Sequence, residues 1–154
     1  MKRILALLPL TLLLGGCGPK PPKAAYPELN ETATLNGSLP WNPRSGRVIT
    51  SWINPGQSMT TLYGDDTAVN YARSHADGKY PFGAKLGAVT WKQQEDPRWF
   101  GGRIPGQVAR VEIVVSNGAG GSYTKYEGAP LKPVPGSDPE RAQFLLEQRA
   151  AVMP

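Results

Sequence analysis

Cysteine and histidine are the side chains most often used for nucleophilic and metal-binding chemistry, and this chain has one of each, Cys17 and His75. One cysteine cannot form an internal disulfide, and it cannot supply the several thiolates of a cysteine-rich zinc site or an iron–sulfur cluster. It also cannot form the C-x-x-C-H sequence that attaches a c-type haem. The composition therefore excludes these groups, and we predict no resident metal or cofactor.

Cys17 directly follows a segment with the design of an export signal. Lys2 and Arg3 precede an apolar run over residues 4–14, which is shorter than the about 20 residues of a membrane-spanning helix and has the length of the apolar part of a secretory signal. The sequence Leu14-Gly15-Gly16-Cys17 resembles the bacterial lipoprotein box, in which the cysteine is acylated on sulfur and, after cleavage, on its new amino group. We predict a signal peptide over residues 1–16 and lipidation of Cys17. The alternative is an ordinary cleaved signal with an incidental cysteine.

The charge balance excludes one class of partner. Removing Lys2 and Arg3 from the 17 basic side chains leaves 15 against 12 acidic ones, a formal net charge of +3 instead of +5. No cluster of Lys and Arg remains that could neutralise a row of phosphates, so we predict no nucleic-acid partner. Gly18 follows the cysteine, where the lipoprotein rule for retention in the inner membrane requires Asp. The expected partner is therefore the outer membrane, with the chain facing the periplasm.

Length and composition predict one folded domain behind a tether. The chain has 154 residues, of which 18 are Gly and 16 are Pro, a content that favours an ordered but turn-rich fold. Prolines are concentrated between residues 19 and 43. We predict that residues 17–46 form a lipidated, proline-rich tether and that residues 47–154 form the domain.

The pattern within residues 47–154 alternates between strands, turns and two helices. Strands are predicted over residues 47–53, 59–63, 85–95 and 108–115, and Asn117-Gly118 indicates a hairpin that returns over residues 122–131. Helices are predicted from Thr67 to His75 and after Asp138-Pro139. Together these elements predict an α+β domain with an antiparallel sheet of four to five strands and two flanking helices.

Alternation within the strands predicts which side chains enter the core. In the strand over residues 108–115, we expect the branched apolar residues to point inward and Arg110 and Glu112 to point outward. In the preceding strand, Gly87 lies on the face that carries Val89 and Trp91. Its missing side chain leaves room there for a close backbone neighbour or a ligand.

Five residues are candidates for a ligand pocket. Aromatic rings supply an apolar wall for a planar or anionic molecule, and a guanidinium supplies a fixed fork of donors. The candidates are Tyr63, Trp91, Trp99, Phe100 and Arg103. The alternative is that Trp91 and Phe100 simply fill the core.

The remaining residues that could bind a metal or take part in catalysis have structural interpretations. His75 ends the first predicted helix, where a solvated cation is favourable; as an iron ligand it would be the only imidazole available. The pairs Asp65-Asp66 and Glu95-Asp96 are interpreted as a helix cap and the start of a turn. We predict no catalytic residue, and the sequence leaves open whether the chain is an enzyme.

Several motifs, taken in order, resemble the cytochrome P-460 domain family over about residues 47–154. They are Met59-Thr60-Thr61-Leu62-Tyr63-Gly64-Asp65-Asp66, Tyr80-Pro81-x-Gly83-Ala84, Val89-Thr90-Trp91, Asp96-Pro97-x-Trp99-Phe100-Gly101-x-Arg103-Ile104-Pro105 and Gln148-Arg149-Ala150-Ala151-Val152-Met153-Pro154. The resemblance implies a curved antiparallel sheet with flanking helices, a periplasmic location and a homodimer. Its haem-bearing members oxidise hydroxylamine or nitric oxide, but their haem-binding cysteines and histidine near the carboxyl end are absent here.

Three functional hypotheses follow. The first is a membrane-anchored lipoprotein whose P-460-like domain lacks c-type haem and acts as a small-ligand-binding or interaction module. The second is a haem-dependent oxidoreductase of the hydroxylamine or nitric-oxide type, which holds haem non-covalently with His75 as ligand. The third is a structural envelope lipoprotein whose domain only packs against a partner.

Overall fold

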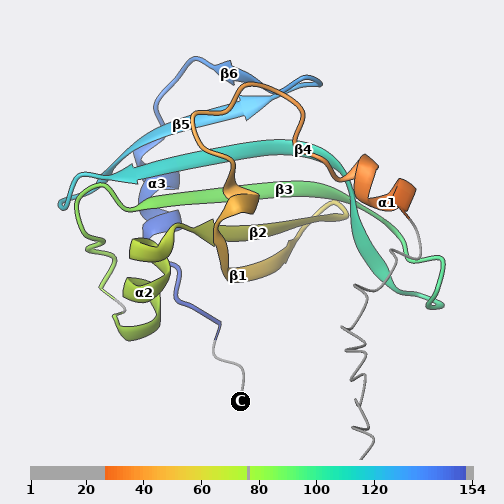
Figure 1. The fold of residues 1–154 in the computed structure, drawn as a ribbon, viewed down its shortest axis with the longest axis horizontal. Helices are drawn as coiled ribbons and strands as arrows, with labels where there is room; N and C mark the ends of the chain where they lie inside the picture. Colours follow the sequence, from red (N-terminus) through yellow and green to blue (C-terminus); the bar gives the residue numbers. More distant parts are fainter. Residues whose placement is uncertain (1–26, 76, 152–154) are drawn as a thin grey trace, which may run out of the picture.

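The computed structural model describes residues 27–75 and 77–151. Its centre is an antiparallel sheet in which each strand pairs with the next along the chain, in the order β1 to β6 (Figure 1). The strands are β1 (Arg47–Asn54), β2 (Ser58–Gly64), β3 (Lys85–Glu95), β4 (Arg103–Ser116), β5 (Gly121–Glu127) and β6 (Lys132–Val134). The predicted signal peptide, Cys17 and Gly18 lie outside the described residues.

The expected α+β class with an antiparallel sheet is confirmed, but the predicted four to five strands are too few, because the sheet has six. The strand that the sequence pattern missed is β6. It has three residues, Lys132–Val134, and one of them is proline, so it is too short to show alternation. It pairs at the sheet edge with Lys125–Glu127 of β5, a position where proline is tolerated.

β4 is also longer than predicted, since it begins at Arg103 within the expected loop. Ile104 and Pro105 pair with Gln94 and Gln93 of β3, and the register shifts between Trp91 and Gln93. Such an irregularity lets β4 continue past Pro105, which has no N–H to donate to the neighbouring strand. The β3–β4 hairpin therefore extends well beyond the rest of the sheet.

Two helices cover one face of the sheet. α2 (Asp66–Ser74) and α3 (Pro139–Leu146) begin within one residue of the predicted positions. Asp65 accepts a hydrogen bond from the backbone N–H of Ala68 (2.8 Å), and Asp138 accepts one from that of Arg141 (2.9 Å), as N-caps do. The core beneath the helices contains buried apolar residues that include Ile49, Leu62, Ala68, Val69, Leu86, Val114, Leu145 and Leu146.

The opposite face is covered by the segment before β1. It starts with α1 (Pro27–Thr32), continues as an extended stretch and ends in a short 3-10 helix, η1 (Pro43–Ser45). Residues 33–45, which we name the strap, lie across β2, β3 and β4 in Figure 1. Leu35 and Leu39 pack against a second core cluster built from buried residues of the sheet and the turn after it, which are Val89, Trp91, Val111, Ile113, Tyr126 and Leu131.

Gly87 shows how close the strap comes. A Cβ atom on Gly87 would lie 2.6 Å from Cγ of Pro43 and 3.0 Å from Cζ3 of Trp41, closer than atoms pack. The expected close neighbour of Gly87 is therefore the strap itself. Residues 33–43 were expected within the tether. Because they pack against the sheet, they belong to the folded part of the chain.

The expectation that Glu112 points outward is wrong. Glu112 is 2 % exposed. It lies on the face of the sheet that α3 covers. Because helices cover one face of the sheet and the strap covers the other, strand positions on both faces are buried, and alternation no longer separates core from solvent. Within the described residues, no helix is long and apolar enough to cross a membrane.

Candidate functional site

The structure separates the five predicted pocket residues into two groups. Tyr63 and Trp91 meet beneath the strap, with ring centroids 6.4 Å apart in an edge-to-face arrangement at 74°. Trp91 is 3 % exposed, and its indole Nε1 donates to the carbonyl of Ala33 (3.4 Å). Burial raises the pKa of Tyr63, and the positive charge of Arg44 opposes that rise. Trp91 therefore fills the core under the strap, as the alternative interpretation expected, but Phe100, which that interpretation also placed in the core, is exposed.

The other three residues lie in and beside the β3–β4 loop, residues 96–102. Trp99 is 72 % exposed and Phe100 is fully exposed. Arg103 begins β4, and its guanidinium lies 4.0 Å from the carboxylate of Glu95. A surface hollow of about 520 Å³ is lined by residues 95–101, with Trp99 and Phe100 among them. This loop shares no wall with Tyr63 and Trp91 in the described contacts, so the five residues do not line one pocket.

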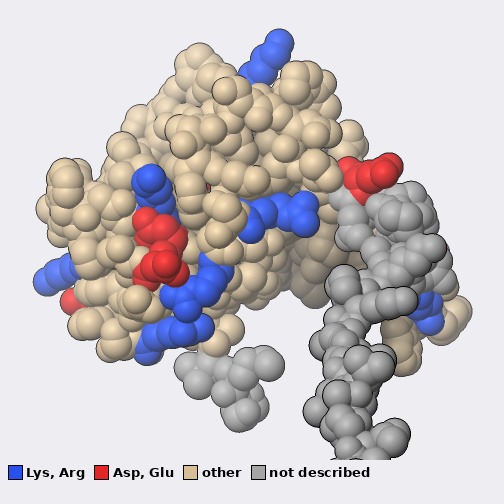
Figure 2. Space-filling model, in the orientation of Figure 1, with Lys and Arg blue, Asp and Glu red and all other residues tan. Residues whose placement is uncertain are grey.

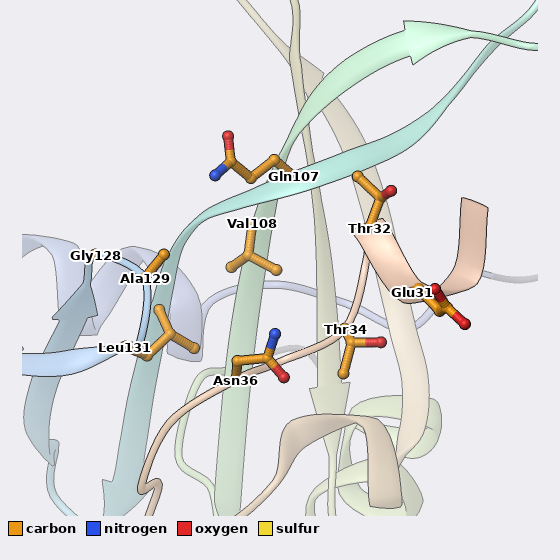
Figure 3. Close-up of a pocket in the computed structure, with 9 residues that line it drawn as sticks. All are labelled: Glu31, Thr32, Thr34, Asn36, Gln107, Val108, Gly128, Ala129 and Leu131. Carbon is orange, nitrogen blue, oxygen red and sulfur yellow. The ribbon is translucent and has the colours of Figure 1, made fainter. Parts of the chain in front are cut away.

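A different hollow of about 350 Å³ opens where α1 and the strap meet β4 and the turn after β5 (Figure 3). Val108 of β4 points toward Asn36 of the strap, with Leu131 beside them. The polar lining is Glu31, Thr32, Thr34, Asn36 and Gln107, and the other lining residues are Val108, Gly128, Ala129 and Leu131. It combines an apolar floor with hydroxyl, amide and carboxylate groups on its rim.

Backbone contacts hold the two walls of this hollow together. The N–H of Leu131 donates to the carbonyl of Asn36 (2.7 Å), and Gly37 forms an isolated parallel bridge with Leu131. Gly37 has a φ of +145° and approaches the Leu131 backbone so closely that a Cβ would lie 2.5 Å from its oxygen. Glycine is required there, because any side chain would displace the strap.

Chemically, this hollow suits a small, uncharged or cationic molecule with several hydrogen-bonding groups. Amides and hydroxyls both donate and accept, and Glu31 only accepts when ionised. An apolar floor with a few polar groups on the rim is the usual composition of a ligand site. The sequence pattern did not predict it, because four of its nine lining residues come from the segment that its prolines marked as a tether.

A buried ionic cluster lies on the opposite face of the sheet, beside α3. Arg141 donates to both carboxylate oxygens of Glu112, from Nε (2.8 Å) and Nη2 (2.9 Å). Tyr123 donates its hydroxyl to the same carboxylate (2.9 Å), and Arg110 donates through Nε (3.2 Å). Bidentate, charge-assisted bonds of this kind are among the strongest in proteins.

The electrostatics of the cluster favour the carboxylate anion. Burial alone would raise the pKa of Glu112, but the hydrogen bonds and positive charge of Arg141, with help from Tyr123 and Arg110, outweigh it and lower that pKa. Burial first, and then the bond to Glu112, raise the pKa of Tyr123. The bond to Glu112 raises the pKa of Arg141, against the effect of burial. The cluster stays charged and hydrogen-bonded, which is the behaviour of a structural ion pair.

Next to this cluster runs a line of polar side chains with matched partners. The indole of Trp52 donates to Asn54 (2.9 Å), Asn54 donates to the hydroxyl of Thr60 (2.9 Å), and Thr60 shares a hydrogen bond with Thr90 (2.8 Å). Among the described residues, no buried side-chain nitrogen or oxygen lacks a hydrogen-bond partner. This face therefore offers a ligand no unsatisfied buried group.

His75 is an exposed residue at the carboxyl end of α2. Its ring stacks on Tyr71, with centroids 4.3 Å apart and an interplanar angle of 5°, and its Nδ1 lies 2.8 Å from the hydroxyl oxygen of Ser74. In the described part of the chain, no three His, Cys, Asp or Glu side chains gather as a metal site would require. The surroundings of His75 are those of a solvated helix end.

The paired carboxylates have the roles that the sequence indicated. Asp65 caps α2, and Asp66 pairs with Arg47 (3.1 Å). Asp96 accepts hydrogen bonds from the backbone and guanidinium of Arg98 at the start of the β3–β4 loop, where the guanidinium lowers the pKa of Asp96. Figure 2 shows basic and acidic side chains interspersed on the part of this surface around α2 and the start of β1.

Comparison with family models and with curated proteins finds no match to this chain.

Proposed function

We propose that the chain is an exported bacterial lipoprotein, attached to the outer membrane through acyl chains on Cys17 and presenting its domain to the periplasm as a small-ligand-binding or interaction module. The observation that carries the proposal is the sequence Leu14-Gly15-Gly16-Cys17 behind a basic start and an apolar run. Small residues before a lone cysteine, at that distance from the amino terminus, supply what cleavage and acylation need.

The absence of any other cysteine supports this assignment. Once Cys17 carries a lipid, no thiol remains in the chain, which suits an oxidising envelope where free thiols react. The domain builds its two apolar cores without disulfides. Export would therefore not depend on oxidative folding.

We propose the hollow between the strap, β4 and the turn after β5 as the ligand site of the module. Its apolar floor and its amides and hydroxyls on the rim support this choice. The finer description of the domain, a curved-sheet member of the cytochrome P-460-like type without c-type haem, is part of the same proposal. It is supported by the order of motifs from Met59 to Pro154 and by the lack of a second cysteine.

Metabolic labelling tests the lipid anchor. The full chain, expressed in a Gram-negative host with an alkyne-tagged fatty acid, should incorporate the tag and appear in the outer-membrane fraction. Cys17→Ala should lose the tag, and inhibition of the lipoprotein signal peptidase should leave the uncleaved form. Full cleavage without any incorporated lipid would contradict the proposal and favour an ordinary secretory signal.

Amide NMR spectra of the unlipidated Cys17→Ala chain test the ligand site. We use N-acetylglucosamine as a small, uncharged probe that carries hydroxyl and amide groups. Its titration should shift the amide resonances around Asn36 and Val108. Asn36→Ala should weaken these shifts, whereas Gln143→Ala, at an exposed position of α3, should leave them unchanged. Shifts that cluster elsewhere would contradict this choice of site.

An absorption spectrum separates this proposal from the oxidoreductase hypothesis. Protein from a haem-supplied host should show no Soret band. A stoichiometric band that disappears in His75→Ala would contradict the haem-free description and support non-covalent haem.

A further inference from the structure

Trp99 and Phe100 form an exposed pair of aromatic side chains in the loop between β3 and β4, and we name this pair the aromatic tip. Trp99 is 72 % exposed and Phe100 is fully exposed. Single exposed apolar residues are normal on protein surfaces, but adjacent large ones indicate a surface that meets an apolar partner. The loop that carries them is not accounted for by the ligand site described above.

The loop is ordered by its own hydrogen bonds. The N–H of Trp99 donates to the carbonyl of Asp96 (3.2 Å), and the N–H of Gly102 donates to that of Trp99 (2.9 Å). The N–H of Asp96 in turn donates to the carbonyl of Gly102 (3.0 Å). Gly101 has a φ of +74°, a conformation that favours glycine. These bonds order the backbone of the turn, and the two side chains that it carries are exposed.

The aromatic tip lies at the same end of the sheet as the start of the described chain. Figure 1 shows α1 and the β3–β4 loop at this end, and α1 contacts β4. The β1–β2 turn is there too, because the N–H of Gln93 donates to the carbonyl of Gln57 (2.8 Å). It brings Ile53, which is 73 % exposed, to this end. Three exposed apolar side chains therefore lie at the end of the sheet where the described chain begins.

The length of chain before α1 restricts what this end can meet. Cys17 and Pro27 are ten residues apart, and an extended chain spans at most about 3.6 Å per residue. Acyl chains on Cys17 would therefore hold α1 within about 36 Å of the bilayer surface. At that distance the membrane is present at a high effective concentration, so that even weak insertion is favoured.

The chemistry of the aromatic tip fits the interface of a bilayer. Tryptophan and tyrosine are enriched where lipid headgroups meet acyl chains, and phenylalanine occurs with tryptophan on the apolar face of segments that lie in this interface. The flanking charges are paired, because Arg98 lies 2.8 Å from Asp96 and Arg103 lies 4.0 Å from Glu95. The driving force would thus be apolar, and we expect it to be similar on zwitterionic and anionic lipids.

We propose that Trp99 and Phe100 insert into the interface of the same bilayer that holds the acyl chains of Cys17, so that the domain lies on the membrane through its β3–β4 end. The inference rests on the lipid anchor of the proposed function. It adds a second contact, which would fix the orientation of the domain and leave the strap side and the helix side accessible from the periplasm.

Fluorescence quenching by lipids tests the contact. The full chain is purified from membranes in detergent, weighed by mass spectrometry to establish the acyl chains on Cys17, and reconstituted into phosphatidylethanolamine–phosphatidylglycerol vesicles with brominated acyl chains. Bromine quenches only those indoles that reach the acyl region. Of the four tryptophans, we expect Trp99 to be quenched, so Trp99→Phe should lose most of the quenching that the wild-type chain shows.

A second variant and a matched control distinguish insertion from proximity. Phe100→Ser keeps Trp99 as the reporter and should lose its quenching, because half of the inserted apolar surface is removed. Phe82→Ser removes a ring that is 83 % exposed in the turn before β3, at the other end of the sheet. The tryptophan fluorescence of this variant should be quenched as strongly as that of the wild-type chain. Both substitutions are on the surface, and unchanged melting temperatures will show that the fold is intact.

The outcomes separate the inference from the proposed function. A chain without acyl mass overturns the lipid anchor and the inference together. An acylated chain whose quenching is the same in Trp99→Phe and wild type overturns the inference alone. Equal loss of quenching in Phe82→Ser and Phe100→Ser would also overturn the inference alone.

Discussion

Glu112 is held inside the protein by three donors, and its chemistry follows from them. Two guanidinium groups and a phenol saturate a carboxylate that is otherwise surrounded by protein. The pKa of Glu112 is lowered from its ordinary value of 4.5, so the folded state prefers the anion more strongly than the unfolded state does. A carboxyl group with a lowered pKa contributes stability that is present above its unfolded value and is lost as the pH falls through the folded value.

Glu112→Gln should destabilise the protein at neutral pH and weaken its acid sensitivity. We expect the free energy of unfolding to fall by about 2–4 kcal/mol, because removing one partner of a buried pair leaves the charge of Arg141 uncompensated. The loss of stability that we expect of the wild-type protein as the pH falls below 4.5, the ordinary pKa of Glu112, should become shallower. Urea unfolding over a series of pH values measures both effects.

The matched control for that variant is Glu127→Gln. Glu127 pairs with Lys125 (3.2 Å), but both side chains are more than a third exposed. Exposed pairs contribute about 0–1 kcal/mol, so this variant should unfold almost like the wild-type protein at every pH. Equal acid profiles for Glu112→Gln and wild type would show that another carboxylate governs acid unfolding.

Residue types predicted local roles better than they predicted contacts. The caps Asp65 and Asp138 were identified because capping depends on neighbours within a few residues of the chain. The aromatic candidates were identified as a group, but whether Trp91 and Trp99 meet depends on the twist and length of the β3–β4 hairpin. Local sequence does not contain that information, and neither does it show that Glu112 will face α3.

At the scale of elements, the strap differs most from its expected description. Its apolar residues Leu35, Leu39 and Trp41 are separated by even numbers of residues, the spacing of an extended segment with one face on a core, but the prolines around them favoured a tether. They are partly buried by contact with a sheet formed much later in the chain. The helices, in contrast, carry start signals and periodicity in their own sequence, which is why both begin within one residue of the predicted positions.

Gly87→Ala should weaken the packing between the strap and the sheet. The added Cβ would overlap Pro43 and approach Trp41, and overpacking of this kind costs about 1–3 kcal/mol. We expect a lower free energy of unfolding and faster cleavage of the strap by a protease at low concentration. Because the indole of Trp41 would become more exposed when the strap loosens, the intrinsic fluorescence of the folded protein should also change.

Gly120→Ala is the control for this substitution. A Cβ on Gly120 would meet only the side chain of Asn117, at 3.9 Å, which is ordinary contact. Surface substitutions of this type change stability by about 0.5 kcal/mol or less. If both alanine variants were equally stable, the strap would not pack on Gly87 in solution as described.

At the scale of the whole molecule, a sheet covered on both faces needs the strap as well as the helices. We therefore predict that a chain beginning at residue 47, the start of β1, is strongly destabilised, because Val89, Val111 and Ile113 lose their cover. Each large apolar side chain returned to water costs about 1.5–3 kcal/mol, and natural domains have about 5–15 kcal/mol in total. Thermal unfolding followed by circular dichroism measures the loss.

A chain beginning at residue 27 keeps the strap and is the comparison for that truncation. It should melt at a temperature close to that of the full mature chain. If the chain from residue 47 melted at the same temperature, the strap would be dispensable, and the domain would extend only over residues 47–154.

Under the proposed lipid anchor, sorting between the two membranes would depend on the residue after Cys17 and not on the domain. The lipoprotein rule places Asp after the acylated cysteine in proteins kept in the inner membrane, and this chain has Gly18 there. Gly18→Asp should therefore move the protein from the outer- to the inner-membrane fraction on a sucrose gradient, while Gly18→Ser stays in the outer membrane. Both variants should keep the acyl tag and the wild-type melting temperature, since Gly18 precedes the packed strap. An acylated Gly18→Asp chain found entirely in the outer membrane would mean that this position does not direct sorting here.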